Sequence, residues 1–377
     1  MSTETRSATK SNFAGNHHSY LPENPTGTGP TDKRQKTMTT RNILTKHLIN
    51  LQRGLDSSSS RAAGRNLYST AASAAAGAGG NLKIGYVPEH FSTPLFFAQS
   101  EGYYSDLGLS PEFKPFPTGT GDMIKALKEN DINLAVGLTE GWVAGLGNAR
   151  ADYKIVGTYV QSPLRWAIST GYNRQDIQSI AQLQGKCFGV SRIGSGSYVM
   201  SFVLAREQGW PGNPPVSFNV LGTFKNLREA VRDEKADAFM WEYFTSKKYY
   251  DNHEIKYIGS IYTPWPSWTI TAAKGLLDAE PATKTIGKFF SAVNKGIQHF
   301  SNYPEKAVDY ISTNLDYTAE DAREWMKTVK FANDVSIVDR TTIVDNTFAI
   351  LHAANVIENA DPVDPNSFVV DTPEFRG

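Results

Sequence analysis

The stretch that decides the fold reads Gly189-Val190-Ser191-Arg192-Ile193-Gly194-Ser195-Gly196-Ser197-Tyr198 and continues as Val199-Met200-Ser201-Phe202-Val203-Leu204. A short apolar strand runs into small residues and then into an apolar helix. This order exposes backbone N–H groups and hydroxyls at a helix N-terminus, where an anion or a polar ligand head can bind. The stretch has neither the Lys-Ser/Thr pair of a P-loop nor the full G-x-G-x-x-G spacing of a dinucleotide turn. We interpret it as a cradle for a small ligand, with an ordinary helix N-cap as the alternative.

The composition limits the classes of partner. The 377 residues include 38 Lys and Arg against 38 Asp and Glu, so the formal net charge is zero. Without an excess of cations to neutralise phosphates, we expect no nucleic-acid partner. Cys187 is the single cysteine, which excludes an intrachain disulfide and favours a cytosolic or organellar compartment. No apolar run reaches about 18 residues, so no transmembrane helix is expected.

Residues 1–80 are predicted to form a basic tail ahead of the folded part. Residues 1–37 are polar and contain few large apolar side chains, which predicts disorder. Residues 38–68 combine several basic side chains with one acid, Asp56, and place apolar residues at helical spacing between Ile43 and Leu55. This combination is typical of a mitochondrial presequence starting at Met38, so we expect a mitochondrial protein. A plain basic tail on a cytoplasmic protein is the alternative.

From residue 82 onward, predicted strands and helices alternate. The strands fall at 82–87, 110–117, 133–138, 153–160, 187–190, 216–221 and 236–241. The helices fall at 93–107, 122–130, 139–148, 197–208, 226–233 and 243–252, and then at 283–302, 304–314, 319–328 and 339–358. The alternation predicts an α/β protein with mostly parallel sheets flanked by helices, followed by a helical C-terminal part.

The two halves of this body resemble each other. Each contains a strand, a Gly/Ser-rich turn and a helix, and each then ends a strand in an acidic and aromatic segment. These segments are Gly137-Leu138-Thr139-Glu140-Gly141-Trp142 and Phe239-Met240-Trp241-Glu242-Tyr243. Because ligands of open α/β sheets bind beyond the carboxyl ends of the strands, both segments are predicted to border a binding site.

Several segments, taken in order, resemble one known family. They are 86–91 with 93–98, 118–123, 130–136, 191–197 and 239–242. Their spacing over residues 81 to 359 resembles two-lobed solute-binding proteins of the type II periplasmic class, of the nitrate, sulfonate and taurine type. The same superfamily contains the fungal thiamine-pyrimidine synthases. The resemblance implies two α/β lobes, two crossover segments and a ligand cleft that closes by hinge motion. It places lobe 1 at 81–165 plus 263–360, lobe 2 at 166–262 and a tail at 361–377.

Two departures from this family bear on the partner and the chemistry. Bacterial transport members carry a secretory signal or a lipoprotein cysteine, and the chain shows neither, which puts a transporter partner in doubt. The thiamine-pyrimidine synthases carry a cysteine-rich iron motif, which a chain with Cys187 alone lacks. We therefore expect an intracellular member from a eukaryote such as a fungus, acting as a monomer.

The candidate ligand-binding residues lie at predicted strand ends and helix starts. His90 and Phe91, next to Glu89, are expected to hydrogen-bond and stack on the ligand. Glu140 and Glu242 would favour a cationic ligand or one with several N–H groups, whereas Arg192 opposite them would suit a zwitterion or heterocycle. The full set is His90, Phe91, Thr118, Gly119, Thr120, Thr139, Glu140, Arg192, Ser195, Gly196, Ser197, Tyr198, Trp241, Glu242 and Trp265. Capping or core packing is the alternative role for each, and core packing is the expected role of Trp268.

Catalytic motifs are scarce. The histidines outside the tail are widely spaced, so neither a metal site nor a cofactor is expected. Gly194-Ser195-Gly196-Ser197 misses the nucleophile-elbow pattern by one position. The sequence therefore favours a carrier or sensor that closes on a small polar or heterocyclic ligand. The alternative is an enzyme on the same fold, acting on a thiamine-pyrimidine-like or chorismate-like substrate through Glu140, Glu242 and His90.

Overall fold

The structure is a computed structural model, and it describes residues 82–149, 152–279, 281–358, 364–370 and 375. All of these residues belong to one compact unit, Leu67–Gly377. The predicted tail and presequence at 1–80 lie outside the described residues, as do parts of the predicted tail at 361–377. Within the described ranges, no helix is both long and apolar enough to cross a membrane.

The first sheet has five strands in the order β2-β1-β3-β10-β4. The strands are β1 (Lys83–Tyr86), β2 (Glu112–Pro115), β3 (Leu134–Leu138), β4 (Tyr153–Val160) and β10 (Trp268–Ala273). β1 runs parallel to β2 and β3, whereas β10 runs antiparallel to β3 and β4. β3 and β10 are buried along their whole length, as expected for central strands that are covered on both faces.

The second sheet repeats this plan with the order β7-β6-β8-β5-β9. Its strands are β5 (Arg165–Gly171), β6 (Cys187–Val190), β7 (Ser217–Val220), β8 (Ala238–Glu242) and β9 (Ile255–Tyr262). β6 runs parallel to β7 and β8, and β5 runs antiparallel to β8 and β9. The internal similarity of the sequence therefore corresponds to two sheets of the same topology.

Both sheets are mostly parallel, as predicted, and each includes one strand of opposite direction, β10 in the first sheet and β5 in the second. β5, β9 and β10 are absent from the predicted strands, and β5 and β10 each pair between a central strand and an edge strand. β5 was missed because Ser169 and Thr170 interrupt the apolar run by which the fully buried β3 was predicted. β10 was missed although Trp268-Thr269-Ile270-Thr271 alternates apolar and polar residues.

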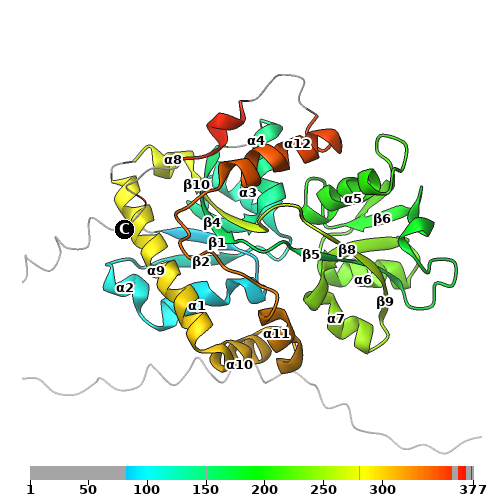
Figure 1. Cartoon of the computed structure of the whole chain (residues 1–377), viewed down its shortest axis with the longest axis horizontal. Helices are drawn as coiled ribbons and strands as arrows, with labels where there is room; N and C mark the ends of the chain where they lie inside the picture. The colour runs from blue at the N-terminus through cyan, green and yellow to red at the C-terminus, as the bar shows by residue number, and fades with distance from the viewer. Residues whose placement is uncertain (1–81, 150–151, 280, 359–363, 371–374, 376–377) are drawn as a thin grey trace, which may run out of the picture. The chain divides into compact units, whose positions relative to one another are not determined.

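The helices flank the two sheets (Figure 1). In chain order they are α1 (Thr93–Ser100), α2 (Tyr103–Asp106), α3 (Thr120–Lys128), α4 (Thr139–Gly147), α5 (Gly196–Glu207), α6 (Phe224–Arg232), α7 (Tyr243–Asp251), α8 (Lys274–Leu277), α9 (Ala282–Asn302), α10 (Pro304–Asn314), α11 (Ala319–Met326) and α12 (Asn346–Ala353). The single helix expected at 93–107 is divided because Gly102 adopts a left-handed conformation, with φ at 77°. The helix expected at 339–358 begins as a π turn at Thr341–Asp345 and ends at Ala353.

The chain passes between the sheets twice, and the two connections are bonded to each other. The outward connection follows β4 and the return connection precedes β10. Ser267 donates its hydroxyl to the Ser162 carbonyl at 2.7 Å, and Leu164 N–H donates to the Thr263 hydroxyl at 2.9 Å. Lys330 N–H donates to the Ser162 hydroxyl at 3.0 Å, which attaches the segment after α11 to the same connection. The two crossovers are thus held together by hydrogen bonds, and we call this pair of segments, which contains Ser162, Leu164, Thr263 and Ser267, the strap.

Packing of α1 against α9 depends on a glycine. A Cβ atom at Gly296 would lie 2.2 Å from the Pro94 carbonyl oxygen and 2.9 Å from the Ala98 Cβ. We predict that Gly296→Ala lowers the free energy of unfolding by about 1–3 kcal/mol, because the clash with backbone exceeds the gain in helix propensity. Chemical denaturation measures this change. Gly275→Ala, at an exposed position of α8, is the matched control, and an equal effect of both variants would contradict the prediction.

Candidate functional site

A cavity lies where strand ends of the first sheet meet strand ends of the second. Its empty volume is about 420 Å³, and residues of both sheets and their following helices line it. The lining residues are Val87, Glu89, Thr118, Gly119, Thr120, Leu138, Leu164, Trp166, Ser191, Ser195, Gly196, Ser197, Trp241, Glu242 and Trp268. Eight of the fifteen predicted ligand-binding residues are among them: Thr118, Gly119, Thr120, Ser195, Gly196, Ser197, Trp241 and Glu242.

The first lobe contributes the residues after β1 and β3 and the start of α3. Gly119 has a φ of 87°, a conformation that favours glycine, and it turns the chain into α3. The Thr120 hydroxyl is buried and accepts a hydrogen bond from Leu138 N–H at 2.9 Å. This bond ties the first turn of α3 to the end of β3, so both elements present a fixed edge to the cavity.

The second lobe contributes the cradle predicted from the sequence. Ser195 is the N-cap of α5 and accepts a hydrogen bond from Tyr198 N–H at 3.3 Å. The hydroxyls of Ser195 and Ser197 lie 3.0 Å apart, and both side chains are buried. A Cβ atom at Gly196 would lie 2.7 Å from Leu138 Cδ1 and 2.8 Å from Trp166 Cη2. Glycine at this position therefore lets the start of α5 approach the end of β3 in the other lobe.

Two carboxyl groups line the cavity, one from each lobe. Glu89, after β1, accepts a hydrogen bond from the Trp241 indole N–H at 3.1 Å, and this bond joins the lobes. Glu242 is the N-cap of α7 and accepts from Thr245 N–H at 2.6 Å. Burial raises the pKa of Glu89 to about 7. Burial, with the charge of Glu89 nearby, raises the pKa of Glu242 to about 8.

His90 lies behind the carboxyl pair and does not line the cavity. Its side chain is fully buried, with its ring 4.4 Å from that of Tyr317 and 4.1 Å from that of Trp325. Burial lowers the pKa of His90 well below its usual value. Its Nε2 lies 3.6 Å from Glu242 Oε2, and neither ring nitrogen makes a hydrogen bond within the described part of the chain.

Three tryptophans line the same cavity. Trp241 was predicted, whereas Trp268 was expected to serve core packing alone. Trp166 and Trp268 sit at the ends of β5 and β10 where the chain crosses between sheets. Their indole N–H groups are buried and have no hydrogen-bond partner among the described residues. The sequence places both beside the crossovers, where a ligand contact and core packing are the two roles to weigh, with core packing favoured for Trp268.

Three predicted site residues lie inside the first lobe instead. The Trp265 indole N–H donates to Glu140 Oε2 at 2.9 Å, and both side chains are buried. The Thr139 hydroxyl donates to the Pro266 carbonyl at 2.5 Å. Burial raises the pKa of Glu140 to about 7. These contacts attach the start of α4 to the return crossover, and none of the three residues is among those that line the central cavity.

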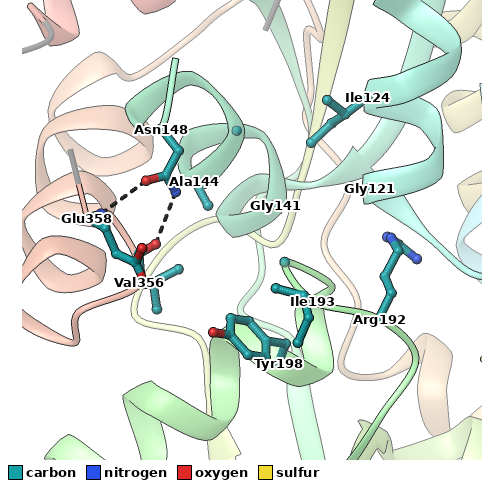
Figure 2. A pocket seen from close by; sticks show the side chains of 12 residues that line it. Gly121, Ile124, Gly141, Ala144, Asn148, Arg192, Ile193, Tyr198, Val356 and Glu358 are labelled. Carbon is teal, nitrogen blue, oxygen red and sulfur yellow. Dashed lines mark hydrogen bonds between the residues drawn. The ribbon is translucent and has the colours of Figure 1, made fainter. Parts of the chain in front are cut away.

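Arg192 and Tyr198 line a second pocket, of about 740 Å³, on the other side of the 191–197 loop (Figure 2). Arg192 donates through Nη1 to the Thr118 carbonyl, and its Nε lies 3.6 Å from Asp122 Oδ1. In Figure 2 the Arg192 side chain lies toward Gly121 and Tyr198 lies across Ile193 from it. Gly121 leaves the room for the guanidinium, because a Cβ there would lie 2.5 Å from Arg192 Nε. Arg192 thus joins the lobes at the edge of the cavity.

Phe91 lines a third pocket, of about 600 Å³, beside the crossovers. Glu242 and Leu164 line both this pocket and the central cavity. Within the described residues, no group of three or more His, Cys, Asp or Glu side chains is arranged to hold a metal ion.

The two mixed sheets, their crossovers and the cavity between them define a periplasmic-binding-protein fold. The chain is similar to the Candida albicans CA3427 gene product, whose structure has been solved. The two sequences are 49% identical, the match covers 78% of this chain and 96% of that chain, and the TM-score is 0.73. A family model described as Ca3427-like PBP matches residues 166–261. The chain belongs to the Ca3427-like family of proteins with the periplasmic-binding-protein fold.

More distant solved structures share the fold alone. The alkanesulfonate-binding protein SsuA from Xanthomonas axonopodis pv. citri, bound to MOPS, is 13% identical, with 77% of this chain and 98% of that chain covered and a TM-score of 0.62. The protein CAE31940 from Bordetella bronchiseptica is 17% identical, with 78% and 96% covered and a TM-score of 0.60. A search of curated proteins gave no significant match. The predicted two-lobed binding-protein fold is confirmed.

The Glu140 carboxyl predicts a pH dependence of stability. Because folding raises its pKa from 4.5 to about 7, its contribution is fully present below about pH 4.5 and is lost as the pH rises through about 7. The loss amounts to about 3 kcal/mol at high pH. We predict that Glu140→Gln, which mimics the protonated acid, flattens this decline in the free energy of unfolding. Denaturation from about pH 5 to about pH 8 measures it, and an unchanged slope in the variant would contradict the assignment.

Proposed function

We propose that this protein binds a small polar or heterocyclic ligand in the cavity between its lobes and acts as a carrier or sensor. The observation that carries the proposal is the set of unpaired polar groups around one cavity. Buried donors without partners are costly, and here the indoles of Trp166 and Trp268 both lack one among the described residues. A ligand with acceptor groups would satisfy them.

The contacts between lobes support a closing motion. On one side of the cavity Arg192 donates to the Thr118 carbonyl, and next to the cavity Trp241 donates to Glu89. On the side of α7, the Thr245 hydroxyl lies 2.8 Å from the Tyr317 hydroxyl, and Tyr249 donates to Asp316. These are polar side-chain contacts, which separate at modest cost in water. The strap of paired crossovers stays bonded while they open and close, as in hinge closure around a ligand.

The proposal is tested by thermal stability in the presence of fractionated metabolite extract. Because a ligand that binds the native state raises stability, we predict that at least one fraction raises the Tm of the wild-type protein. Gly196→Val should lose this shift, because the added side chain would meet Leu138 and Trp166 where the lobes approach. Gly275→Val is the control and should keep it. The proposal fails if no fraction shifts the wild type, or if Gly196→Val responds as the wild type does.

A second candidate function, acid–base catalysis, is favoured by one observation. The Glu242 carboxyl has a pKa raised to about 8 and lies 3.6 Å from His90 Nε2, so the pair resembles the perturbed groups of active sites. Incubation of the protein with the fraction that stabilises it, followed by mass spectrometry, distinguishes the two. Catalysis would be established if the wild type forms a chemically altered compound and His90→Gln does not, although the variant still binds the compound in the fraction. An unaltered compound supports the carrier or sensor.

We further propose that residues 38–68 direct the protein to the mitochondrion, because that segment is basic, nearly free of acids and amphipathic. A fluorescent protein fused to residues 38–80 is predicted to enter mitochondria. Replacing Arg41, Lys46 and Arg53 by Glu should leave it in the cytosol. A fusion that stays cytosolic without these changes would contradict the proposal.

A further inference from the structure

The central cavity combines two carboxyl groups with aromatic surface. Glu89 and Glu242 line it together with Trp166, Trp241 and Trp268, and none of its described lining residues is Lys, Arg or His. We propose that its ligand is a small organic cation, whose positively charged nitrogen lies between the two carboxyl groups and against the tryptophan rings. This inference rests on the proposed binding function and names the chemical class of the ligand.

Two arginine side chains lie near the cavity and contact other groups. Arg192 is held at the cavity edge by the Thr118 carbonyl and faces Asp122 at 3.6 Å, while its Nε and Nη2 have no hydrogen-bond partner among the described residues. Arg165 lies with its guanidinium carbon 3.6 Å from the centre of the Tyr243 ring and donates to the Ser260 hydroxyl at 3.1 Å. Neither side chain makes an ion pair with Glu89 or Glu242, so the two carboxyl groups are left for a ligand to neutralise.

The remaining groups that face the carboxyl pair do not supply a cation either. His90, from the turn after β1, has a pKa lowered well below its usual value by burial and is therefore neutral near pH 7. Tyr317, from the segment between α10 and α11, has a pKa raised well above its usual value by burial and stays a neutral phenol. Thr245, from α7, contributes a hydroxyl and a backbone N–H to Glu242.

The protonation of Glu89 and Glu242 follows from these surroundings. With pKa values raised to about 7 and about 8, Glu89 and Glu242 hold protons over much of the neutral range. A singly charged cation placed between them favours the ionisation of one of the two carboxyl groups and lowers its pKa. Binding of a cation is therefore coupled to the release of protons, and its affinity rises with pH up to about 8. The affinity for an anion or for a neutral ligand would not rise with pH in this way.

The tryptophans supply faces for a cation and donors for the rest of the ligand. Indole rings attract cations through their faces, most strongly when water is excluded. Trp241 is held in place by its bond to Glu89 and by stacking on Phe224, with ring centroids 5.2 Å apart. The unpaired indole N–H groups of Trp166 and Trp268, with the start of α5, favour a hydrogen-bond acceptor at the other end of the ligand. A hydroxyl or carbonyl group on the cation meets this requirement.

This ligand class is opposite in charge to a sulfonate. An anion in this cavity requires Glu89 and Glu242 to stay protonated, because each carboxylate that ionises would repel it in a medium of low dielectric constant. The fold shared with an alkanesulfonate-binding protein therefore does not extend to the chemistry of this cavity. The residues that set the difference are Glu89 and Glu242.

The test uses the full chain with tetramethylammonium, choline and ethanesulfonate at millimolar concentration. We expect both cations to raise the Tm and to bind in isothermal titration calorimetry, choline more tightly, with ethanesulfonate inactive. Choline affinity should rise about tenfold per pH unit from about pH 6 to about pH 7, as one proton leaves on binding. Heats measured in buffers of different ionisation enthalpy should report that released proton.

Glu89→Gln is the decisive variant, because its amide oxygen can still accept the hydrogen bond from Trp241 while the charge is removed. We expect its affinity for choline to fall about tenfold or more and its pH dependence to weaken. Glu112→Gln, at an exposed position of β2, is the matched control and should bind as the wild type does. The inference is overturned if ethanesulfonate binds and the cations do not, if none of the three binds, or if Glu89→Gln binds choline unchanged. A metabolite fraction that still raises the Tm in those cases would leave the proposed binding function standing, whereas the absence of any such fraction would remove both.

Discussion

The bonded pair of crossovers is the constraint on which the rest of the structure depends. Ser162 and Leu164 on the outward segment are joined to Ser267 and Thr263 on the return segment, so the chain leaves the first sheet and re-enters it at one place. β5 and β10 follow directly from these segments and pair in the middle of their sheets. The strap therefore determines which strand ends face each other, and the cavity forms between those ends.

The same arrangement explains why two carboxyl groups with raised pKa values line one cavity. Glu89 and Glu242 come from different lobes and meet only because the strand ends are opposed, and burial raises the pKa of each. A pair of carboxyl groups removed from water and without a cation beside it is costly to ionise. The presence of such a pair at a cavity therefore points to the charge of the ligand. Glu140 shows the contrast. It is fully buried, whereas Glu89 is half-buried, and Trp265 fixes it inside the first lobe, so its raised pKa reflects packing alone.

Much of the fold and part of the site could be predicted from the sequence. The strand-turn-helix at 187–208 and the segment ending in Trp241 and Glu242 were predicted correctly because glycine, serine and a strand end are local signals. β5 was missed because Ser169 and Thr170 interrupt the apolar run expected of a fully buried strand. β10 was missed although Trp268-Thr269-Ile270-Thr271 alternates apolar and polar residues, and the two missed strands contain Trp166 and Trp268. Arg192, Glu140 and Trp265 do not line the central cavity, because the direction of a side chain depends on tertiary contacts such as those with Thr118 and the return crossover, which the sequence does not reveal.

The central claim is that a small molecule occupies the cavity between the lobes. Native mass spectrometry of the protein purified from its own cells tests it most directly, with the released compound identified after denaturation. The account predicts a single excess mass of a few hundred daltons or less, one molecule per chain, which is lost when Gly196 is replaced by valine. A protein that carries no compound from the cell, and acquires none from its extract, would contradict it.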